Sequence, residues 1–425
     1  MRRSEHGRQS DRRNVSRAIL ALVMVAAATV AACTPMSGPA RPSRPVAAPP
    51  QRVETAPSPQ NLPRQPGVDA PLPNMTAGTL GNDGLVRVGL LVPLTGRGAG
   101  AGQALSNAAQ MAAFDMGDRR FVLQPYDTGG TPAGAARAAQ QALSQGARLL
   151  LGPLFGASAR AVGPVAAGAG VNVVAFTTDP GVAGGNVFVM GFLVAEQVDR
   201  MVAFAMGEGR TRFGTLTPDE TYGYAAASAF RDRVAARGGQ MVAAQTYAPD
   251  NPDLREPARA LRGADAVLIP DAGDGLRAAA NGLAYVDIDS RRTRYMGTML
   301  WDDPDLWRES ALAGGIFPAP PRGSARAFDR KYTDAFGAAP PDLAVLGYDA
   351  VALAAVLART PGGARFDRAT LTSAAGFSGV AGIFRFRPDG TVQRGLAVME
   401  IQSDGTVAEV SPAPLSFDGG GRLGF

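Results

Sequence analysis

Short apolar runs alternate with longer, alanine-rich segments from residue 85 onward. A run such as VRVGLLV at 86–92 has the length and continuous hydrophobicity of a strand buried on both faces. We expect such strands at 86–92, 121–127, 148–151, 171–176, 212–216, 241–246 and 266–270. We expect helices at 103–116, 132–143, from about Ser158, at 224–237 and at 254–261. Strands that alternate with helices predict right-handed βαβ units on parallel sheets.

The alternation runs through two successive units, 86–176 and 212–270, and therefore predicts an α/β chain with two lobes. In open parallel sheets, ligands bind outside the carboxyl ends of the strands. Two facing lobes would form a cleft between such ends, so this cleft is the expected ligand site.

The first 33 residues have the pattern of an export signal. Residues 1–17 are polar and rich in Arg, and AILALVMVAAATVAA at 18–32 is uninterrupted by polar residues other than one Thr. The segment VAAC at 30–33 resembles the lipobox of bacterial lipoproteins, so we predict a signal peptide at 1–32 and lipidation of Cys33. An ordinary cleavage site with an incidental cysteine is the alternative. Thr34, where inner-membrane lipoproteins carry Asp, favours the outer membrane over the inner membrane.

Residues 34–84 contain 12 of the 33 prolines of the chain and no aromatic residue. Such a segment cannot bury enough apolar surface to offset its ordering entropy, so we expect 33–84 to be a disordered linker. At about 3 Å per residue, it would reach on the order of 150 Å at full stretch. The folded part, 85–425, would then work away from the membrane that holds the anchor.

The rarest residues exclude several function classes. The chain of 425 residues has one His, His6, and one Cys, Cys33. Residues 34–425 therefore lack Ser-His-Asp and Cys-His catalysis, His-bound zinc, Cys₄ sites and disulfides. The net charge of +5 includes +4 from residues 1–32, where six Arg face Glu5 and Asp11, which leaves about +1 for the rest. A nearly neutral body predicts no nucleic-acid partner.

Six segments of the folded part resemble the type I periplasmic solute-binding proteins of the leucine/isoleucine/valine-binding family. They are VGLLVPLTG at 88–96, DTGGTP at 127–132, LGP at 151–153, FTT at 176–178, PDETYG at 218–223 and LGYDA at 346–350. The resemblance implies the two-lobed type I periplasmic-binding-protein fold, in which each lobe is a parallel sheet flanked by helices and the ligand cleft lies between the lobes. It implies lobe 1 at about 85–193 and 322–375, and lobe 2 at about 194–321 and 376–425.

Three further segments make the chain most similar to the penicillin-binding-protein activator lipoproteins. They are GPLF at 152–155, GTMLWDDP at 297–304 and GIFRFRPDG at 382–390. This narrower resemblance implies a non-enzymatic lipoprotein whose partner is a peptidoglycan synthase. Enterobacterial members of that group carry an additional N-terminal helical-repeat domain, and this chain has the Pro-rich segment in its place.

The wider resemblance also implies ligand-binding residues. In the solute-binding family, Ser and Thr side chains and a helix N-terminus of the first lobe hold a ligand carboxylate, which implies Thr95, Ser158, Thr177 and Thr178. Unpaired N–H groups at a helix start do attract anions. Tyr222 matches the aromatic residue of the second lobe that covers the ligand. The structural alternatives are an N-cap for Ser158, turn hydrogen bonds for the Thr residues and packing for Tyr222.

One position departs from the family pattern. Amino-acid receptors of the family place a carboxylate two residues after the glycine that is Gly297 here, and this chain has Met299. A thioether cannot pair an ammonium, so Asp302, Asp303 or Asp271 on neighbouring loops are the candidate substitutes, although no spacing requires them. The departure disfavours amino-acid transport and favours the activator function.

A nucleotide site is a weaker interpretation. The loop GRGAGA at 96–101 matches G-x-G-x-x-A, but PLT at 93–95 separates its first glycine from the strand. The dinucleotide motif needs that glycine at the strand end. We therefore predict no cofactor and no metal.

The sequence thus predicts a periplasmic, lipid-anchored protein without enzymatic activity that activates a penicillin-binding protein. The alternative is the substrate-binding lipoprotein of an ABC importer for an amino acid or a similar small polar solute, with an ABC permease as partner. A carboxylate-based hydrolase is disfavoured, because no pair of acidic residues occupies matching strand ends.

Overall fold

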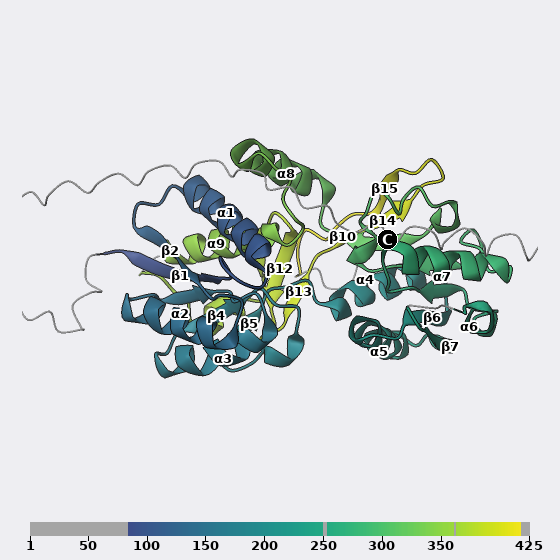
Figure 1. Cartoon of the computed structure of the whole chain (residues 1–425), viewed down its shortest axis with the longest axis horizontal. Helices are drawn as coiled ribbons and strands as arrows, with labels where there is room; N and C mark the ends of the chain where they lie inside the picture. The colour runs from purple at the N-terminus through teal and green to yellow at the C-terminus, as the bar shows by residue number, and fades with distance from the viewer. Residues whose placement is uncertain (1–83, 250–252, 361–362, 418–425) are drawn as a thin grey trace, which may run out of the picture. The chain divides into compact units, whose positions relative to one another are not determined.

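The computed structural model describes residues 84–249, 253–360 and 363–417 (Figure 1). The predicted signal peptide, the lipidation site at Cys33 and the predicted linker, except Gly84, lie outside the described residues. No helix in the described part of the chain is long and apolar enough to cross a membrane.

The first sheet is fully parallel, with the strand order β2-β1-β3-β4-β5. Its strands are β1 (Val86–Val92), β2 (Phe121–Asp127), β3 (Leu149–Leu151), β4 (Asn172–Ala175) and β5 (Val187–Val189). Its helices are α1 (Ala99–Met116), α2 (Pro132–Ser144), α3 (Gly156–Gly168) and α9 (Ala344–Ala358). In Figure 1, α1 and α9 lie on one face of this sheet and α2 and α3 on the other. Cover on both faces explains why Leu90, Leu91 and Val92 are all fully buried.

The second sheet has the strand order β15-β14-β10-β9-β8-β6-β7. Its strands are β6 (Arg212–Pro218), β7 (Gln240–Tyr247), β8 (Ala266–Leu268), β9 (Arg294–Met296), β10 (Ile316–Ala319), β14 (Ala397–Ile401) and β15 (Val407–Ser411). Strands β6 to β10 pair in parallel, and β14 and β15 add an antiparallel edge. Its helices are α4 (Val194–Gly207), α5 (Thr221–Ala236), α6 (Arg255–Ala260) and α7 (Gly273–Tyr285).

The two faces of the second sheet bury separate apolar clusters. Val198 and Phe230 of α4 and α5 pack with Leu268 on one face. Leu276 and Leu283 of α7 belong to the cluster on the other face, which contains Tyr295 and Trp301. The two sheets with their helices are the two lobes, so the predicted α/β class with parallel sheets flanked by helices is confirmed.

A small antiparallel sheet of β11 (Phe377–Gly379), β12 (Gly382–Phe386) and β13 (Val392–Arg394) completes the first lobe. Phe384, Phe386 and Val392 belong to the core cluster of the first sheet. The carbonyl oxygen of Gly390 accepts a hydrogen bond of 2.8 Å from the N–H of Val189 in β5. Residues 377–394 therefore pack with the first lobe, although the sequence-based division assigns everything after 375 to the second.

The remaining elements are α8 (Arg322–Phe336), α10 (Arg368–Leu371) and the short 3₁₀ helices η2 (Pro180–Val182), η3 (Met299–Trp301) and η4 (Ser310–Leu312). Phe328 and Tyr332 of α8 pack against Ala108 of α1, so α8 belongs to the first lobe. The chain passes between the lobes at 190–193, 320–321 and 395–396, which are the three crossing segments.

The expected strands at 86–92 and 121–127 are confirmed to the residue. Helix α1 begins at Ala99, four residues before the expected start, because Gly98 takes the left-handed conformation with φ 80° and turns the chain into the helix early. The antiparallel edge, the small sheet and the parallel strands β5, β9 and β10, each three to five residues long, were not expected.

Candidate functional site

Thr95 lies in the loop that follows β1, where its side chain forms a hydrogen bond with Asp127 at the end of β2. The carboxylate of Asp127, at the end of β2, accepts hydrogen bonds from the hydroxyl of Thr95 and from the N–H groups of Leu94 at 2.8 Å and Gly129 at 2.8 Å. Burial opposes ionisation of Asp127, but these hydrogen bonds outweigh it and lower its pKa. The hydroxyl of Thr95 therefore holds two loops together at the carboxyl end of the first sheet.

Ser158 lies in the first turn of α3, but it does not open the helix as expected. The helix begins at Gly156, and Phe155 occupies the N-cap position without a side-chain hydrogen bond. Ser158 is 1% exposed, and its hydroxyl has no hydrogen-bond partner in the described part of the chain. The first N–H groups of a helix also lack partners within the helix. The first turn of α3 therefore places the positive end of the helix dipole beside a hydroxyl that has no hydrogen-bond partner among the described residues.

Two charged side chains lie near the start of α3. The guanidinium of Arg97 lies 5.1 Å from the ring centre of Phe155. The carboxylate of Asp179 is paired with Arg160 at 2.6 Å. Because Asp179 is paired with Arg160, Arg97 is a cation near the start of α3 that is available to an anion.

Thr177 and Thr178 follow β4 and differ in environment. Thr177 is 6% exposed, and its hydroxyl accepts a hydrogen bond of 3.1 Å from the N–H of Asp179. Thr178 is exposed. The turn role considered for Thr177 is thus present in the structure, while Thr178 presents its hydroxyl to solvent.

Tyr222 is the second residue of α5 and lies at the carboxyl end of the second sheet. Burial raises the pKa of its hydroxyl, and the neighbouring hydroxyl of Thr298 acts in the opposite direction. Thr298 follows β9 and Thr217 lies near the end of β6, and both are fully buried. The hydroxyl of Thr298 neighbours that of Tyr222, whereas the hydroxyl of Thr217 has no hydrogen-bond partner among the described residues. Thr215 pairs in register with Leu268, and Leu268 pairs with Met296. Thr217 and Thr298 each follow two residues later in the chain, so they lie at the same level beyond the ends of these pairings.

Asp271 and Asp302, the expected partners for a ligand ammonium, are both engaged within the protein. Asp271 accepts hydrogen bonds from the N–H of Ala272 at 2.7 Å and from the hydroxyl of Tyr247. Asp302 forms a 2.6 Å ion pair with Arg322, the first residue of α8. Asp302 thus already has a cation, whereas Asp271 is held by a hydroxyl and a backbone N–H group.

Met299 lines a pocket of about 90 Å³ together with Asp302, Arg322, Asp329 and Asp342. Burial raises the pKa of Asp329 and of Asp342, and the nearby Asp302 raises both further while Arg322 opposes. One cation therefore faces three carboxyl groups. The pocket brings together loops of both lobes, because Met299 and Asp302 follow β9 whereas α8 and Asp342 belong to the first lobe.

A second, larger cavity of about 580 Å³ lies between α9 and the hairpin of β11 and β12. Its lining is mostly apolar and includes Leu353, Val356 and Phe377, with the buried carboxylate of Asp349 among them. It lies among first-lobe elements and contains none of the residues expected from the sequence.

Within the described residues, no hydrogen bond joins two of the expected site residues to each other. Arg97, Gln197, Thr217, Thr298 and Arg322 are the residues at these edges that the sequence analysis missed. Thr217 and Thr298 could have been found from the strand ends that carry them, but Arg322 and Gln197 become neighbours of the site only in three dimensions. No group of three or more His, Cys, Asp or Glu side chains in the described ranges could hold a metal ion.

A family model described as periplasmic binding protein matches residues 85–406. No curated protein matches the chain. The solved structures that match include a putative branched-chain amino acid ABC transporter protein from Rhodospirillum rubrum, with 20% identity and a TM-score of 0.67 over 77% of this chain and 100% of that one.

Two other matching structures contain ligands. One is the solute-binding protein of an ABC transporter from Rhodopseudomonas palustris in complex with 3,4-dihydroxybenzoic acid, with 21% identity and a TM-score of 0.55 over 78% of this chain and 97% of that one. The other is the branched-chain amino acid transporter substrate binding protein of Streptococcus pneumoniae in complex with isoleucine. It has 20% identity and a TM-score of 0.54 over 76% of this chain and 97% of that one. At these identities the likeness concerns the fold.

Proposed function

The chain belongs to the periplasmic binding protein family, and on this basis we propose that it is the non-enzymatic substrate-binding lipoprotein of an ABC importer for a small polar solute. The family implies a periplasmic or extracytoplasmic location. The observation that carries the proposal is the pair of buried hydroxyls without partners among the described residues at the carboxyl edges of the two sheets, Ser158 in one lobe and Thr217 in the other. Buried polar groups in folded proteins nearly always have a partner, so such groups at a binding edge favour a ligand or bound water there.

We propose that the ligand bears a carboxylate. The position of Met299 lacks the carboxylate by which amino-acid receptors hold an ammonium, although Asp302, Asp329 and Asp342 line the same pocket. Arg97 and the N-terminus of α3 attract an anion on the first lobe. On the second lobe, Met299 replaces the carboxylate of the amino-acid receptors, and Asp271 and Asp302 are engaged with Tyr247 and Arg322. A solved relative that binds 3,4-dihydroxybenzoic acid provides an example of such a ligand in this fold.

Ligand titration tests the proposal. We would titrate 3,4-dihydroxybenzoate, benzoate, leucine and isoleucine into the full-length protein and follow binding by calorimetry and the melting temperature. The aromatic acids are expected to raise the melting temperature, because a ligand that binds only the folded state stabilises it. Low-micromolar binding of leucine or isoleucine would contradict the charge argument while supporting the receptor. Failure of these four compounds and of a broad metabolite library to bind would contradict the receptor itself.

The anchor is part of the proposal. We propose that Cys33 is lipidated and holds the protein to a membrane, so that Cys33→Ser releases it into the soluble fraction without a change in melting temperature. Retention of the variant in membranes after a high-salt wash would contradict this anchor.

Activation of a penicillin-binding protein remains a second candidate, favoured by Met299 and by the prolines of residues 34–84. An activator on the outer membrane must reach a synthase near the inner one, whereas an importer receptor needs only a short tether. Deletion of residues 52–77 would therefore abolish an activator in cells and leave an importer receptor active. An Asp at position 34, which directs lipoproteins to the inner membrane, should rescue the shortened activator.

A further inference from the structure

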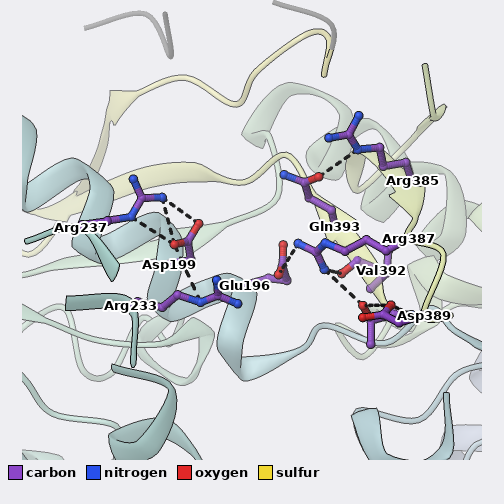
Figure 2. Close-up of polar contacts among 10 residues, drawn as sticks. Glu196, Asp199, Arg233, Arg237, Arg385, Arg387, Asp389, Val392 and Gln393 are labelled. Atoms are coloured by element: carbon purple, nitrogen blue, oxygen red, sulfur yellow. Dashed lines mark hydrogen bonds and ion pairs between the residues drawn. The ribbon is translucent and has the colours of Figure 1, made fainter. Parts of the chain in front are cut away.

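The first turn of α4 contacts both lobes through two adjacent side chains, Glu196 and Gln197. Helix α4 begins at Val194, directly after the first crossing segment. Figure 2 shows Glu196 pointing toward Arg387, which follows β12, and Nη2 of Arg387 donates to Oε1 of Glu196 at 2.7 Å. Because the β12–β13 hairpin packs with the first sheet, this ion pair joins helix α4 of the second lobe to the first lobe.

The carboxylate of this ion pair is nearly buried, and the guanidinium is about one-third exposed. The side chain of Glu196 is 9% exposed and that of Arg387 is 32% exposed. The same guanidinium group donates to the carbonyl oxygen of Val392 at 3.0 Å, which holds it in place within the hairpin. Removal of Arg387 would leave the nearly buried carboxylate of Glu196 without this cation.

Gln197 connects the same turn to the loop that carries Met299. Its Oε1 accepts a hydrogen bond of 2.9 Å from the N–H of Met299, and its Nε2 donates to the carbonyl oxygen of Phe192 at 3.1 Å. Gln197 is 4% exposed, so no solvent competes for these bonds. The carbonyl of Phe192 belongs to the first crossing segment, and the guanidinium of Arg394 lies 4.5 Å from the ring centre of Phe192. The side-chain amide of Gln197 therefore links the loop at 298–299 to the first crossing segment, 190–193, which serves as a hinge between the lobes.

We infer that Glu196 and Gln197 are positioning residues that couple the loop at 298–299 to the hinge and set the angle between the lobes. This inference rests on the proposed function for its ligand side. A displacement of Met299 by a ligand is passed through Gln197 to the crossing segment, while Glu196 fixes the other end of the same turn to the first lobe. Hinge motions of this kind need only a few residues at element ends to absorb the change.

Helix α4 also offers a matched control. Asp199 lies one turn further along, and its carboxylate pairs with Arg233 of α5 at 4.0 Å and with Arg237, directly after α5 in the same lobe, at 2.9 Å (Figure 2). Asp199→Asn therefore removes an ion pair from the same helix without touching the other lobe. Glu196→Gln removes one ion pair that joins the lobes and leaves another, Asp302–Arg322, in place.

The test measures the distance between the lobes in the absence of ligand. In the full chain with Cys33→Ser, spin labels at Gln140→Cys on α2 and Ser228→Cys on α5, both surface positions on opposite lobes, give an interlobe distance distribution by pulsed electron resonance. We expect Glu196→Gln and Gln197→Leu to shift or broaden this distribution and Asp199→Asn to leave it unchanged. Gln124→Leu, a partly buried Gln within the first lobe, is the control for Gln197→Leu.

Unchanged distributions for both Glu196→Gln and Gln197→Leu would overturn the inference. Equal shifts in all four variants would also overturn it, because they would indicate general loosening of the protein. If Glu196→Gln does not fold, Arg387→Gln removes the same pair from the first lobe. The measurement needs no solute, so a failure of the proposed receptor function is seen in the titrations and not here.

Discussion

The carboxylate of Asp349 accepts hydrogen bonds from two successive N–H groups, that of Val380 at 2.7 Å and that of Ala381 at 3.2 Å. Asp349 lies on α9 and is 1% exposed, while Val380 and Ala381 form the turn between β11 and β12. The contact therefore attaches the small sheet to the helix layer of the first lobe. Burial raises the pKa of Asp349 to about 6, although Arg394 and the two N–H groups act in the opposite direction.

This raised pKa predicts how stability depends on pH. Asp349 binds its proton more tightly in the folded chain than in the unfolded chain, so the folded state binds more protons between about pH 4 and pH 6. Its contribution to the free energy of unfolding therefore falls as the pH rises through this window, by roughly 3 kcal/mol for about two pKa units. We expect Asp349→Asn to remove this fall, measured by urea unfolding of both proteins at about pH 4 and pH 7. A difference between the two proteins that is the same at both pH values would contradict the prediction.

Asp127 should make the free energy of unfolding depend on pH in the opposite direction, so it serves as a control for Asp349. Its pKa is lowered in the folded chain, so it stabilises the protein above its unfolded pKa, and that contribution is lost as the pH falls. We expect Asp127→Asn to weaken the protein at neutral pH and to flatten its loss of stability toward acid.

Substitution of Met299 by Glu should restore the charge that amino-acid receptors of the family use. A carboxylate beside the ligand ammonium forms a charge-assisted hydrogen bond of roughly 1.5–3 kcal/mol, which corresponds to about ten- to a hundredfold in affinity. We expect Met299→Glu to bind leucine more tightly than the wild type, and Met299→Gln to show no comparable gain. Calorimetry that finds equal affinities for all three proteins would place the ligand elsewhere.

Ser158 and Thr177 should respond differently to loss of their hydroxyls. The hydroxyl of Ser158 has no partner among the described residues, so Ser158→Ala is expected to keep or raise the melting temperature. The hydroxyl of Thr177 accepts from the N–H of Asp179, so Thr177→Val should cost about 1 kcal/mol. Urea unfolding measures both. Destabilisation by Ser158→Ala would indicate a structural role for that hydroxyl.

Gly297 cannot be replaced without a shift of its neighbours. A Cβ atom at this position would lie 2.2 Å from the ring of Trp301, which is fully buried. We expect Gly297→Ala to destabilise the protein by about 1–3 kcal/mol, because overpacking forces the indole from its place. At Gly100, in the first turn of α1, an added Cβ atom would meet nothing within 4 Å, so Gly100→Ala should be neutral or slightly stabilising. Thermal unfolding of the two variants compares them directly.

The sequence by itself determined the strands at 86–92 and 121–127 to the residue and the other five expected strands to within two residues at their ends. A strand covered on both faces must be apolar throughout, so runs such as those of β1 and β2 can be identified without knowledge of their neighbours. The loops that carry Thr95, Ser158, Thr177 and Tyr222 follow from these strands, because the carboxyl ends of parallel strands share one edge of the sheet. The short strands of the small sheet lack such a pattern, so their place in the first lobe had to come from the packing of Phe384 and Phe386.

Only the tertiary structure decided which of these polar groups are free. The hydroxyl of Thr95 is taken by Asp127, 32 residues away, and the N–H of Met299 by Gln197, 102 residues away. Asp302 is taken by Arg322, on a helix that belongs to the other lobe. A side chain's type fixes how many hydrogen bonds it can make, but its partner is fixed by which loops meet when the lobes fold. Loops that are distant in sequence meet there because the chain crosses between the lobes three times.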